Sequence, residues 1–368
     1  MSELQSFLIN REEFADTRWE DTEVPSPGEG QVLLAIDSFA LTANNITYAA
    51  FGDALQYWAF FPAPASRGIL PVWGFAEVVE SNCKGIETGE RFYGFYPLAS
   101  HLLVEPAQVS ATSFTDHAEH RRPLPLIYNQ YLRSSADALY EEGKEALQML
   151  LRPLFTTSFL LDDFFADQAM FGAKNLHLTS ASSKTAIGMA FCLQNNRANR
   201  DLDYEIIGLT SARNQAFVES LGCYDRVVSY DQVDAIDNTQ PSAIVDFAGD
   251  GTLLRQLHSQ LAPELRYSCM VGASHWDQRA GAGPGLDGPE PIMFFAPHQA
   301  EKRVGEWGGE EFQRRLSGQW RAFCAFANGW MEVDERHGRE AIERTYAEVL
   351  GGDFSPRSGY VLSKLSCQ

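Results

Sequence analysis

The sequence predicts an α/β protein in which a β-rich N-terminal part is followed by alternating strands and helices. Residues 24–109 contain short segments of strand character, separated by turns rich in glycine and proline. From about residue 151 the apolar pattern alternates between strand and helix, which is typical of a parallel sheet with right-handed crossovers. At 368 residues the chain is too long for one ordinary domain and fits two.

The first part predicts a barrel or sandwich of short strands. The segment QVLLAIDSF at 31–39 alternates apolar and polar side chains, as a half-buried strand does. Further strands are predicted at 73–80, 90–95 and 101–104, and a helix is predicted over 135–151.

The second part predicts a doubly wound sheet. Its strand IVDF is an apolar run, as expected when helices cover both faces of a parallel sheet. The segment 357–362 predicts a closing strand at the C-terminal end. The strands predicted before it are 176–180, 205–210, 226–230, 243–247, 267–272 and 292–295, and the helices are 155–171, 184–194, 213–221, 251–261 and 310–330.

The charge of the chain argues against nucleic acid as a partner. Lysine and arginine total 29 against 49 acidic residues, which gives a net charge of −20 that repels phosphate backbones. An anionic ligand therefore needs a local cationic pocket.

The first residues lack the basic and apolar regions of a secretory signal, and no run approaches the roughly 20 apolar residues of a membrane helix. We expect a cytoplasmic protein without a membrane partner.

The six cysteines lie far apart in the sequence, so they predict neither a CxxC pair nor a disulfide framework. We interpret them as buried, reduced thiols.

His117 and His120 are the only close histidine pair, and a solvated loop explains them better than a metal site does. No bound metal is expected.

Four segments carry a resemblance to a known superfamily. They are PSPGEGQVLLAIDSFALTANNITYAAFG, GFAEVVESNCKGIETGERFYGF, the helix end Leu221–Cys223 with the following RVVSY, and the tail SPRSGYVLS. Together with the order of the two parts, they resemble the medium-chain dehydrogenase/reductase superfamily. The similarity is to its zinc-free quinone and enoyl reductases, and nearest to an uncharacterised branch of unknown function.

This resemblance implies a GroES-like β-barrel domain over 1–150 and 310–368, with a Rossmann cofactor-binding domain inserted at 151–309. It implies an NADP(H)-dependent, zinc-independent oxidoreductase acting on an activated double bond or carbonyl. The zinc-dependent branch needs a cysteine around Thr42–Thr47 and a histidine near Trp73–Ala76, and both are missing. A homodimer is also implied, because relatives often pair edge strands and 292–295 is an apolar candidate edge.

The turn after the first Rossmann strand departs from the family pattern. Relatives place glycines there, because backbone amides must approach the pyrophosphate. In this chain, hydroxyl groups and one lysine stand in that place and are candidates for phosphate contact. Those candidates are Ser180, Ser182, Ser183, Lys184 and Thr185. The alternative is a plain helix N-cap, for which serine and threonine are favoured.

The end of the second Rossmann strand favours NADPH over NADH. An NAD site usually has an acidic residue there to bind the ribose 2′-hydroxyl, whereas this chain has Thr210, Ser211 and Arg213. A hydroxyl and a guanidinium suit a 2′-phosphate, and Tyr230 matches a tyrosine of the adenosine pocket. A solvated helix start is the alternative for Arg213.

Residues after the next two strands are expected to line the nicotinamide side, because ligands of open α/β sheets bind at the carboxyl ends of strands. Asp246 is equally explained as a loop cap. The lining candidates are Phe247, Ala248, Gly249, Val271, Gly272 and Ala273.

The candidate chemistry lies in ANNITY, in YNQY and in FTTSF. Asn45 matches a polar position beside the nicotinamide, and Tyr48 could protonate the reduced substrate as a general acid. Tyr128 could orient a substrate carbonyl, and Thr157 matches a threonine close to the cofactor. Packing in the barrel is the alternative for Tyr48.

Three other functions have some support in the sequence. Ser-Ser-Lys-Thr at 182–185 lacks both glycines of a P-loop. Tyr140 and Lys144 have the Y-x-x-x-K spacing of short-chain dehydrogenases, but they precede the dinucleotide fold that this chemistry requires. A non-catalytic binding or regulatory protein with the same fold stays open, because the phosphate turn is unusual.

Overall fold

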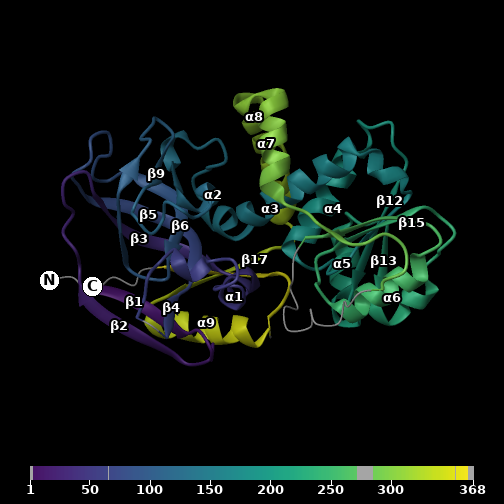
Figure 1. Cartoon of the computed structure of the whole chain (residues 1–368), viewed down its shortest axis with the longest axis horizontal. Helices are drawn as coiled ribbons and strands as arrows, with labels where there is room; N and C mark the ends of the chain where they lie inside the picture. Colours follow the sequence, from purple (N-terminus) through teal and green to yellow (C-terminus); the bar gives the residue numbers. More distant parts are fainter. Residues whose placement is uncertain (1–2, 65, 272–284, 353, 364–368) are drawn as a thin grey trace. The chain divides into compact units, whose positions relative to one another are not determined.

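The structure, a computed structural model, describes residues 3–64, 66–271, 285–352 and 354–363. The chain forms two compact units (Figure 1). Unit 1 comprises Met1–Leu150 and Met331–Gln368, and unit 2 comprises Leu151–Trp330. Unit 2 is therefore inserted into the sequence of unit 1.

The second boundary follows Trp330 rather than residue 309, because helix α8 (Gly309–Ala327) packs within unit 2. Phe323 of α8 stacks on Phe155, with ring centroids 4.6 Å apart, and contacts Phe191 at 5.4 Å. The apolar face of α8 is thus buried against helices of unit 2.

Unit 1 contains the two antiparallel-rich sheets of the described residues. In the larger one, β3 pairs with β5 along most of its length and also with β7 and β18, and only β17–β18 is parallel. Its strands in spatial order are β17 (Glu332–His337), β18 (Ser358–Ser363), β3 (Val32–Leu41), β5 (Pro71–Ser81), β6 (Arg91–Pro97), β10 (Gln130–Arg133), β9 (Ser113–Asp116) and β8 (Pro106–Ala107), with β7 (His101–Val104) beside β3. The smaller sheet has the order β2 (Thr17–Glu23), β1 (Glu3–Asn10) and β4 (Arg67–Ile69).

Short helices accompany these sheets. They are α1 (Ala43–Ala50), η1 (Tyr57–Ala59), α2 (Leu126–Asn129), η2 (Ser134–Ala136) and α9 (Arg339–Gly351).

The core of unit 1 is rich in aromatic side chains, and the backbone packs very closely against one of them, Trp58. A Cβ atom on Gly52 or Gly68 would lie 2.0 Å or 2.3 Å from the Trp58 ring. Only glycine lets the backbone approach this indole on both sides.

Unit 2 is built on a six-stranded sheet in which every neighbouring pair is parallel. Its order is β13 (Arg226–Ser229), β12 (Glu205–Thr210), β11 (Asn175–Leu178), β14 (Ser242–Asp246), β15 (Leu265–Met270) and β16 (Ile292–Met293). The chain runs outward from β11 in one direction and then from β14 in the other. This is a doubly wound Rossmann sheet, and the predicted α/β fold class is confirmed.

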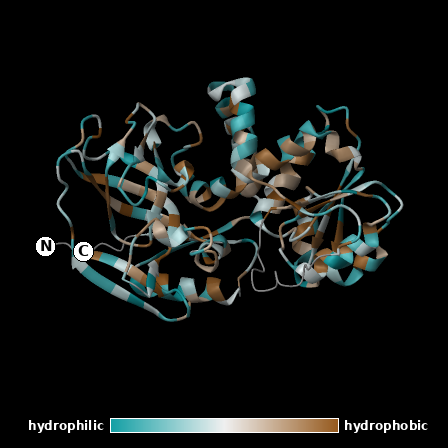
Figure 2. Cartoon of the chain, in the orientation of Figure 1, coloured by the Kyte–Doolittle hydropathy of each residue, from teal (hydrophilic) through white to brown (hydrophobic). Residues whose placement is uncertain are grey.

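The helices of unit 2 alternate with its strands along the chain. They are α3 (Glu145–Asp167, which begins in unit 1), η3 (Ala169–Gly172), α4 (Lys184–Arg197), η4 (Ala212–Asn214), α5 (Gln215–Leu221), η5 (Tyr230–Ala235), α6 (Gly251–Leu261), α7 (Ala296–Trp307) and α8. Helix α6 buries Leu253, Leu254, Leu257 and Leu261 on one face. In Figure 2, helix α6, like α9, carries both brown hydrophobic segments and teal hydrophilic segments.

One predicted pair of helices is wrong. The helices expected at 135–151 and 155–171 are a single helix, α3, that begins only at Glu145 and contains Pro153. The preceding residues form turns, and Gly143 adopts a positive φ of 79° there. Since Pro153 lacks an amide hydrogen, the sequence marks a helix break that packing overrides.

Several strands and helices were not predicted from the sequence: β1, β2, β4, β8, β9, β10, β17, α1, α2, α7 and α9. In the part of the chain that the structure describes, no helix has both the length and the apolar character needed to span a membrane.

The contact between β3 and β5 makes a stability prediction. A Cβ atom on Gly74 of β5 would lie 2.4 Å from the Ser38 carbonyl oxygen and 2.9 Å from Phe39 Cβ. Because backbone atoms cannot move aside cheaply, Gly74→Ala should lower the free energy of unfolding by about 1–3 kcal/mol. Gly318→Ala is the matched control. Gly318 is exposed within α8 with no atom within 4 Å of its added Cβ, so alanine should stabilise by roughly 0.5–1 kcal/mol. Thermal and urea unfolding measure both changes, and shifts of the same sign would contradict this account.

Candidate functional site

The loops at the carboxyl ends of β11 to β15 share one edge of the sheet in unit 2. The predicted cofactor residues that the structure describes all lie at or shortly after the carboxyl ends of these strands. Ser180, Ser182, Ser183, Lys184 and Thr185 follow β11; Thr210, Ser211 and Arg213 end or follow β12; Tyr230 follows β13; Phe247, Ala248 and Gly249 follow β14; and Val271 follows β15. The predicted Gly272 and Ala273 lie outside the described residues.

The turn after β11 has a glycine-like conformation without a glycine. Ser180 has a positive φ of 49°, a region that side chains other than glycine rarely enter. Its amide donates a hydrogen bond of 2.9 Å to the Tyr230 hydroxyl. The Tyr224 hydroxyl donates to the Ala181 carbonyl at 2.9 Å. Two tyrosines from other elements thus hold this turn.

The N-terminus of α4 combines a cap with a lysine. Ser183 is the N-cap, and its Oγ accepts a hydrogen bond from the Ala186 amide. The Thr185 carbonyl accepts a 2.7 Å hydrogen bond from Ser158 Oγ. Lys184 is the first helical residue, and desolvation lowers the pKa of its ammonium to about 8. A cation is unfavourable at a helix N-terminus. An anion bound here would interact favourably with the helix dipole and would also stabilise the desolvated ammonium.

A threonine and an aspartate join the two strands at which the sheet order reverses. Thr179 Oγ1 donates to Asp246 Oδ1 at 2.6 Å and accepts from the amides of Phe247 and Ala248 at 2.9 Å and 3.1 Å. Asp246 Oδ1 also accepts from the Ala248 and Gly249 amides. Burial raises the pKa of Asp246. Asp246 therefore caps the loop after β14, which is the second of the two readings left open for it.

The loop after β12 contacts the turn after β11. Thr210 is buried and Arg213 is exposed. Asn214 Nδ2 donates to Ser182 Oγ at 3.1 Å. Asn214 and Thr179 were missed by the sequence reasoning, although each polar residue directly follows a strand or its short turn. Arg213 forms no ion pair within the described parts of the chain, so its guanidinium is available to an anion.

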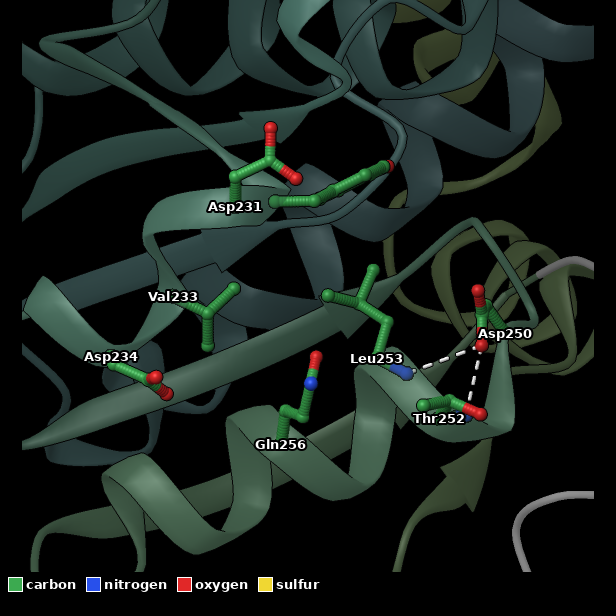
Figure 3. A pocket seen from close by; sticks show the side chains of 8 residues that line it. Asp231, Val233, Asp234, Asp250, Thr252, Leu253 and Gln256 are labelled. Carbon is green, nitrogen blue, oxygen red and sulfur yellow. Dashed lines mark hydrogen bonds between the residues drawn. The ribbon is translucent and has the colours of Figure 1, made fainter.

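A pocket of about 320 Å³ opens beside Tyr230 (Figure 3). Its lining residues are Tyr230, Asp231, Val233, Asp234, Asp250, Thr252, Leu253 and Gln256. Asp250 Oδ1 accepts hydrogen bonds from the Thr252 and Leu253 amides and so caps α6. Burial raises the pKa of Tyr230 to about 12. Carboxylates repel phosphate, so this pocket suits a neutral group that offers hydrogen-bond donors.

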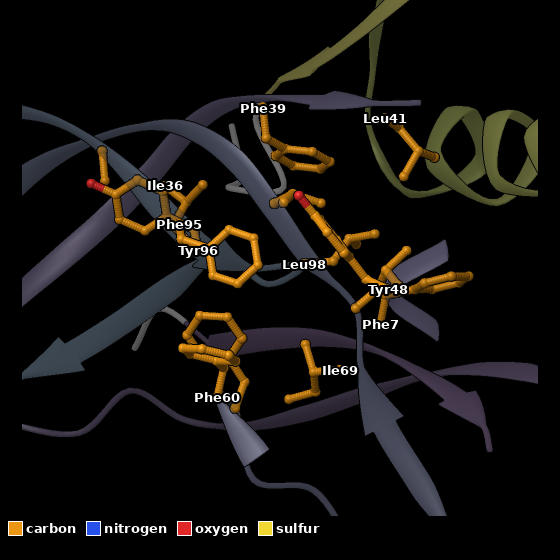
Figure 4. Close-up of a cluster of buried hydrophobic side chains, with 14 of the residues drawn as sticks. Phe7, Ile36, Phe39, Leu41, Tyr48, Phe60, Ile69, Phe95, Tyr96 and Leu98 are labelled. Atoms are coloured by element: carbon orange, nitrogen blue, oxygen red, sulfur yellow. The ribbon is translucent and has the colours of Figure 1, made fainter. Parts of the chain in front are cut away.

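In unit 1, Tyr48 of α1 lies among buried aromatic side chains (Figure 4). Its hydroxyl accepts hydrogen bonds from Asn44 Nδ2 at 2.7 Å and from Trp73 Nε1 at 3.2 Å. Its ring contacts Tyr57 and Phe95, with centroids 4.5 Å and 5.5 Å away. Burial raises the pKa of Tyr48, so the phenol keeps its proton at neutral pH.

Tyr128 is close to this group. Its hydroxyl forms a 3.2 Å hydrogen bond with the Tyr57 hydroxyl, and its ring lies 4.7 Å from Phe95 and 6.0 Å from Trp73. Burial raises the pKa of Tyr128 as well. Two of the predicted catalytic residues, Tyr48 and Tyr128, therefore share one polar and aromatic cluster.

Asn45 does not join that cluster. Its Oδ1 accepts from the Thr42 amide at 2.7 Å, and its Nδ2 donates to the Pro71 carbonyl at 2.8 Å. The first bond caps α1 and the second fixes α1 to β5. The Asn45 amide thus holds α1 in place within unit 1, and its position beside the nicotinamide stays a prediction.

Thr157 lies on α3 in unit 2, where its Oγ1 donates to the Pro153 carbonyl at 3.5 Å. It is half-buried, and its helical hydrogen bond leaves the oxygen able to accept another.

The alternative motifs do not assemble. The Tyr140 hydroxyl donates to Glu145, and Lys144 pairs with Glu141, so the Y-x-x-x-K spacing creates no tyrosine–lysine pair. Among the residues that the structure describes, no three histidine, cysteine or carboxylate side chains come together to hold a metal ion.

Solved structures with the same fold cover almost all of this chain. CurA from Vibrio vulnificus in complex with NADPH has a TM-score of 0.59 at 12% identity, covering 99% of this chain and 100% of that one. A mutant enoyl thioester reductase from Candida tropicalis gives 0.57 at 10%, with coverages of 99% and 100%. The quinone oxidoreductase from Coxiella burnetii gives 0.53 at 14%, with 98% and 99%. These likenesses confirm the predicted fold of a GroES-like domain with a Rossmann domain.

A comparison with curated proteins finds no match. One family profile, described as "Protein of unknown function (DUF2855)", matches residues 39–355. Since this match covers most of the sequence, the chain belongs to the DUF2855 family, in agreement with the uncharacterised branch expected from its motifs.

Proposed function

We propose that this protein is an NADPH-dependent oxidoreductase that transfers hydride to an activated double bond or a carbonyl group. The observation that carries the proposal is the hydroxyl-rich turn 180–185 with Lys184, located where the order of a doubly wound sheet reverses. Ligands of such sheets bind at this edge. The shared fold with CurA, crystallised with NADPH, and with enoyl and quinone reductases supports the same reading.

Lys184 and the hydroxyls of Ser182, Ser183 and Thr185 would hold the pyrophosphate. The half-buried ammonium at the N-terminus of α4 would pair with an anion, which would offset the desolvation that lowers its pKa. Ser211 and Arg213 would bind the 2′-phosphate, because the aspartates that line the pocket beside Tyr230 would repel it. That pocket would take the adenine ring, whose amino group can donate to a carboxylate.

The nicotinamide would supply the hydride, while the protein orients the substrate and delivers a proton. Tyr48 would donate that proton, because its hydroxyl is protonated and already accepts two hydrogen bonds. Tyr128 would orient the substrate, and Thr157 would lie near the cofactor. Enones, quinones and enoyl thioesters are the substrate classes that this chemistry fits. No zinc would take part.

The second candidate is a protein that keeps the fold without catalysis. Two observations favour it: the Ser180 amide is engaged by Tyr230, and three aspartates line the neighbouring pocket. A fluorescence titration with NADPH separates the two candidates, because a phosphate site that has been lost will give no saturable binding.

A homodimer formed through β16 is also proposed. Ile292, Met293 and Phe295 are about half exposed, and β16 is the last strand on its side of the sheet among the described residues. An apolar edge strand tends to pair with another chain.

Arg213→Ala should weaken NADPH binding by roughly 10- to 100-fold, which is the worth of one charge-assisted contact of about 1.5–3 kcal/mol. NADH lacks the 2′-phosphate, so its dissociation constant should hardly change. Fluorescence titrations of both cofactors measure the two effects. Arg266→Ala, which removes an exposed arginine paired with Glu264, is the control. Equal weakening of both cofactors would show that Arg213 does not read the phosphate.

Tyr48→Phe should lower turnover by about 100-fold or more, because it removes the proton of a positioned acid and keeps the ring. The assay follows NADPH oxidation with 1,4-naphthoquinone, cyclohex-2-enone and crotonyl-coenzyme A, after dialysis against a chelator and elemental analysis for zinc. NADPH affinity should be unchanged. Tyr96→Phe, which removes a buried hydroxyl that donates to the Phe92 carbonyl, is the control. Full turnover in Tyr48→Phe would return Tyr48 to a packing role.

The assembly is tested with Ile292→Asp. Light scattering at micromolar concentration should give the mass of two chains for the unmodified protein and of one chain for the variant, because a buried carboxylate opposes strand pairing. Val79→Asp, at an exposed apolar position of unit 1, should remain a dimer. A monomeric unmodified protein would refute the proposal.

A further inference from the structure

Two N–H groups from different elements converge on one phenol oxygen in unit 1. Asn44 lies one turn before Tyr48 on α1, and Trp73 lies on β5. We propose that Asn44 and Trp73 are positioning residues that aim the Tyr48 proton at the substrate and stabilise the phenolate left after its transfer. This role rests on the proposed reductase function and goes beyond it, because that function requires only the Tyr48 proton and does not specify what holds the phenol.

The geometry fixes the direction of the proton. A phenol oxygen has two acceptor positions and one hydrogen. The Asn44 amide at 2.7 Å and the Trp73 indole at 3.2 Å occupy the acceptor positions. The Tyr48 hydrogen must therefore point along the remaining direction, away from both donors.

The two donors are held in place by the local structure. Asn45, next to Asn44, caps α1 through the Thr42 amide and reaches β5 through the Pro71 carbonyl. This bond joins the helix that carries Asn44 and Tyr48 to the strand that carries Trp73. These contacts therefore hold both donors within hydrogen-bond distance of the Tyr48 oxygen without the help of a ligand.

The electrostatics explain why a buried phenol needs them. Burial and the neighbouring Tyr57 raise the pKa of Tyr48, whereas the bonds from Trp73 and Asn44 lower it. The titratable groups that face this hydroxyl group are Tyr57 from η1 and Tyr128 from α2, both neutral phenols. Hydrogen bonds to the charged form favour it, so the two N–H groups act on the phenolate as an oxyanion hole acts on a substrate oxygen.

A bound NADPH would supply the hydride that reduces the double bond or carbonyl and would itself be oxidised, which leaves an anion on the substrate. That anion takes the Tyr48 proton, so the phenol O–H bond breaks and a new C–H or O–H bond forms on the product. The Tyr48 phenolate, held by Asn44 and Trp73, recovers its proton from water before the next turnover.

The kinetic test compares Asn44→Ala, Asn44→Asp and Trp73→Phe with the unmodified protein, using NADPH and the three probes named above. Each change should lower kcat by roughly 10- to 100-fold, the worth of one charge-assisted hydrogen bond. The KM for NADPH should stay constant. Asn44→Asp should be at least as slow as Asn44→Ala, because a carboxylate accepts the Tyr48 proton instead of donating to its oxygen. Trp19→Phe removes an indole donor that bonds Glu343 elsewhere in unit 1 and should leave kcat unchanged.

Combination with Tyr48→Phe distinguishes positioning from structural damage. If the donors act through Tyr48, removing them in the Tyr48→Phe background should cost nothing further. The ¹³C shift of the Tyr48 Cζ carbon, identified by its loss in Tyr48→Phe, should move in the Asn44 and Trp73 variants and stay fixed in Trp19→Phe.

Two results would overturn the proposal while the unmodified protein remains active: kcat losses that persist in the Tyr48→Phe background, or a Cζ shift that ignores both donors. Failure of the unmodified protein to oxidise NADPH with any probe would instead overturn the reductase function, and this catalytic role with it. The Cζ shift would then still report whether the two donors hold Tyr48.

Discussion

The hydrogen bond between the Thr179 hydroxyl and the Asp246 carboxylate is the interaction on which the candidate cofactor edge depends. It joins β11 to β14, the two strands from which the sheet is wound in opposite directions. The same two side chains accept the amides of Phe247, Ala248 and Gly249, so one buried pair sets the path of the loop beyond β14. Without it, these amides would lose the acceptors that the two side chains provide, and an unsatisfied buried amide costs more free energy than a single hydrogen bond contributes.

The adjacent turn shows how a chain can dispense with a glycine. A serine at a φ of 49° costs on the order of 1–2 kcal/mol relative to an ordinary conformation. Tyr230 and Tyr224 bond to the backbone on either side of that strain, and the Ala181 amide also donates to the Leu209 carbonyl at 2.9 Å. The surrounding structure therefore holds a conformation that the residue itself does not favour.

Much of the fold follows from local pattern. The strands of unit 2 and its helices α4, α5, α6 and α8 lie within a few residues of their predicted positions, because buried parallel strands are apolar runs and these helices have a helical period. The two helices predicted on either side of Pro153 are one helix, since burial of α3 outweighs the missing amide hydrogen. Exposed strands such as β17, with the sequence EVDERH, carry no apolar alternation and could not be recognised.

The candidate site was less predictable, because its contacts join residues far apart in the sequence. The sequence marks Tyr48 as a candidate acid, but the indole that donates to it comes from strand β5, 25 residues away. Asn44 and Asn45 are neighbours of the same residue type, so the sequence alone does not tell their roles apart. Only the position on α1 assigns one amide to capping and the other to the phenol, one helical turn away.

The insertion of unit 2 has a consequence for the order of folding during synthesis. β3 is made early, yet its partner β18 is more than 300 residues further along the chain and pairs Tyr360 with Leu41. All strands of unit 2 emerge from the ribosome between these two. The parallel sheet can therefore form while the aromatic core of unit 1 still lacks a strand, and the emerging N-terminal segment must wait with an unpaired edge. Chaperones that cover such edges would act on unit 1 first.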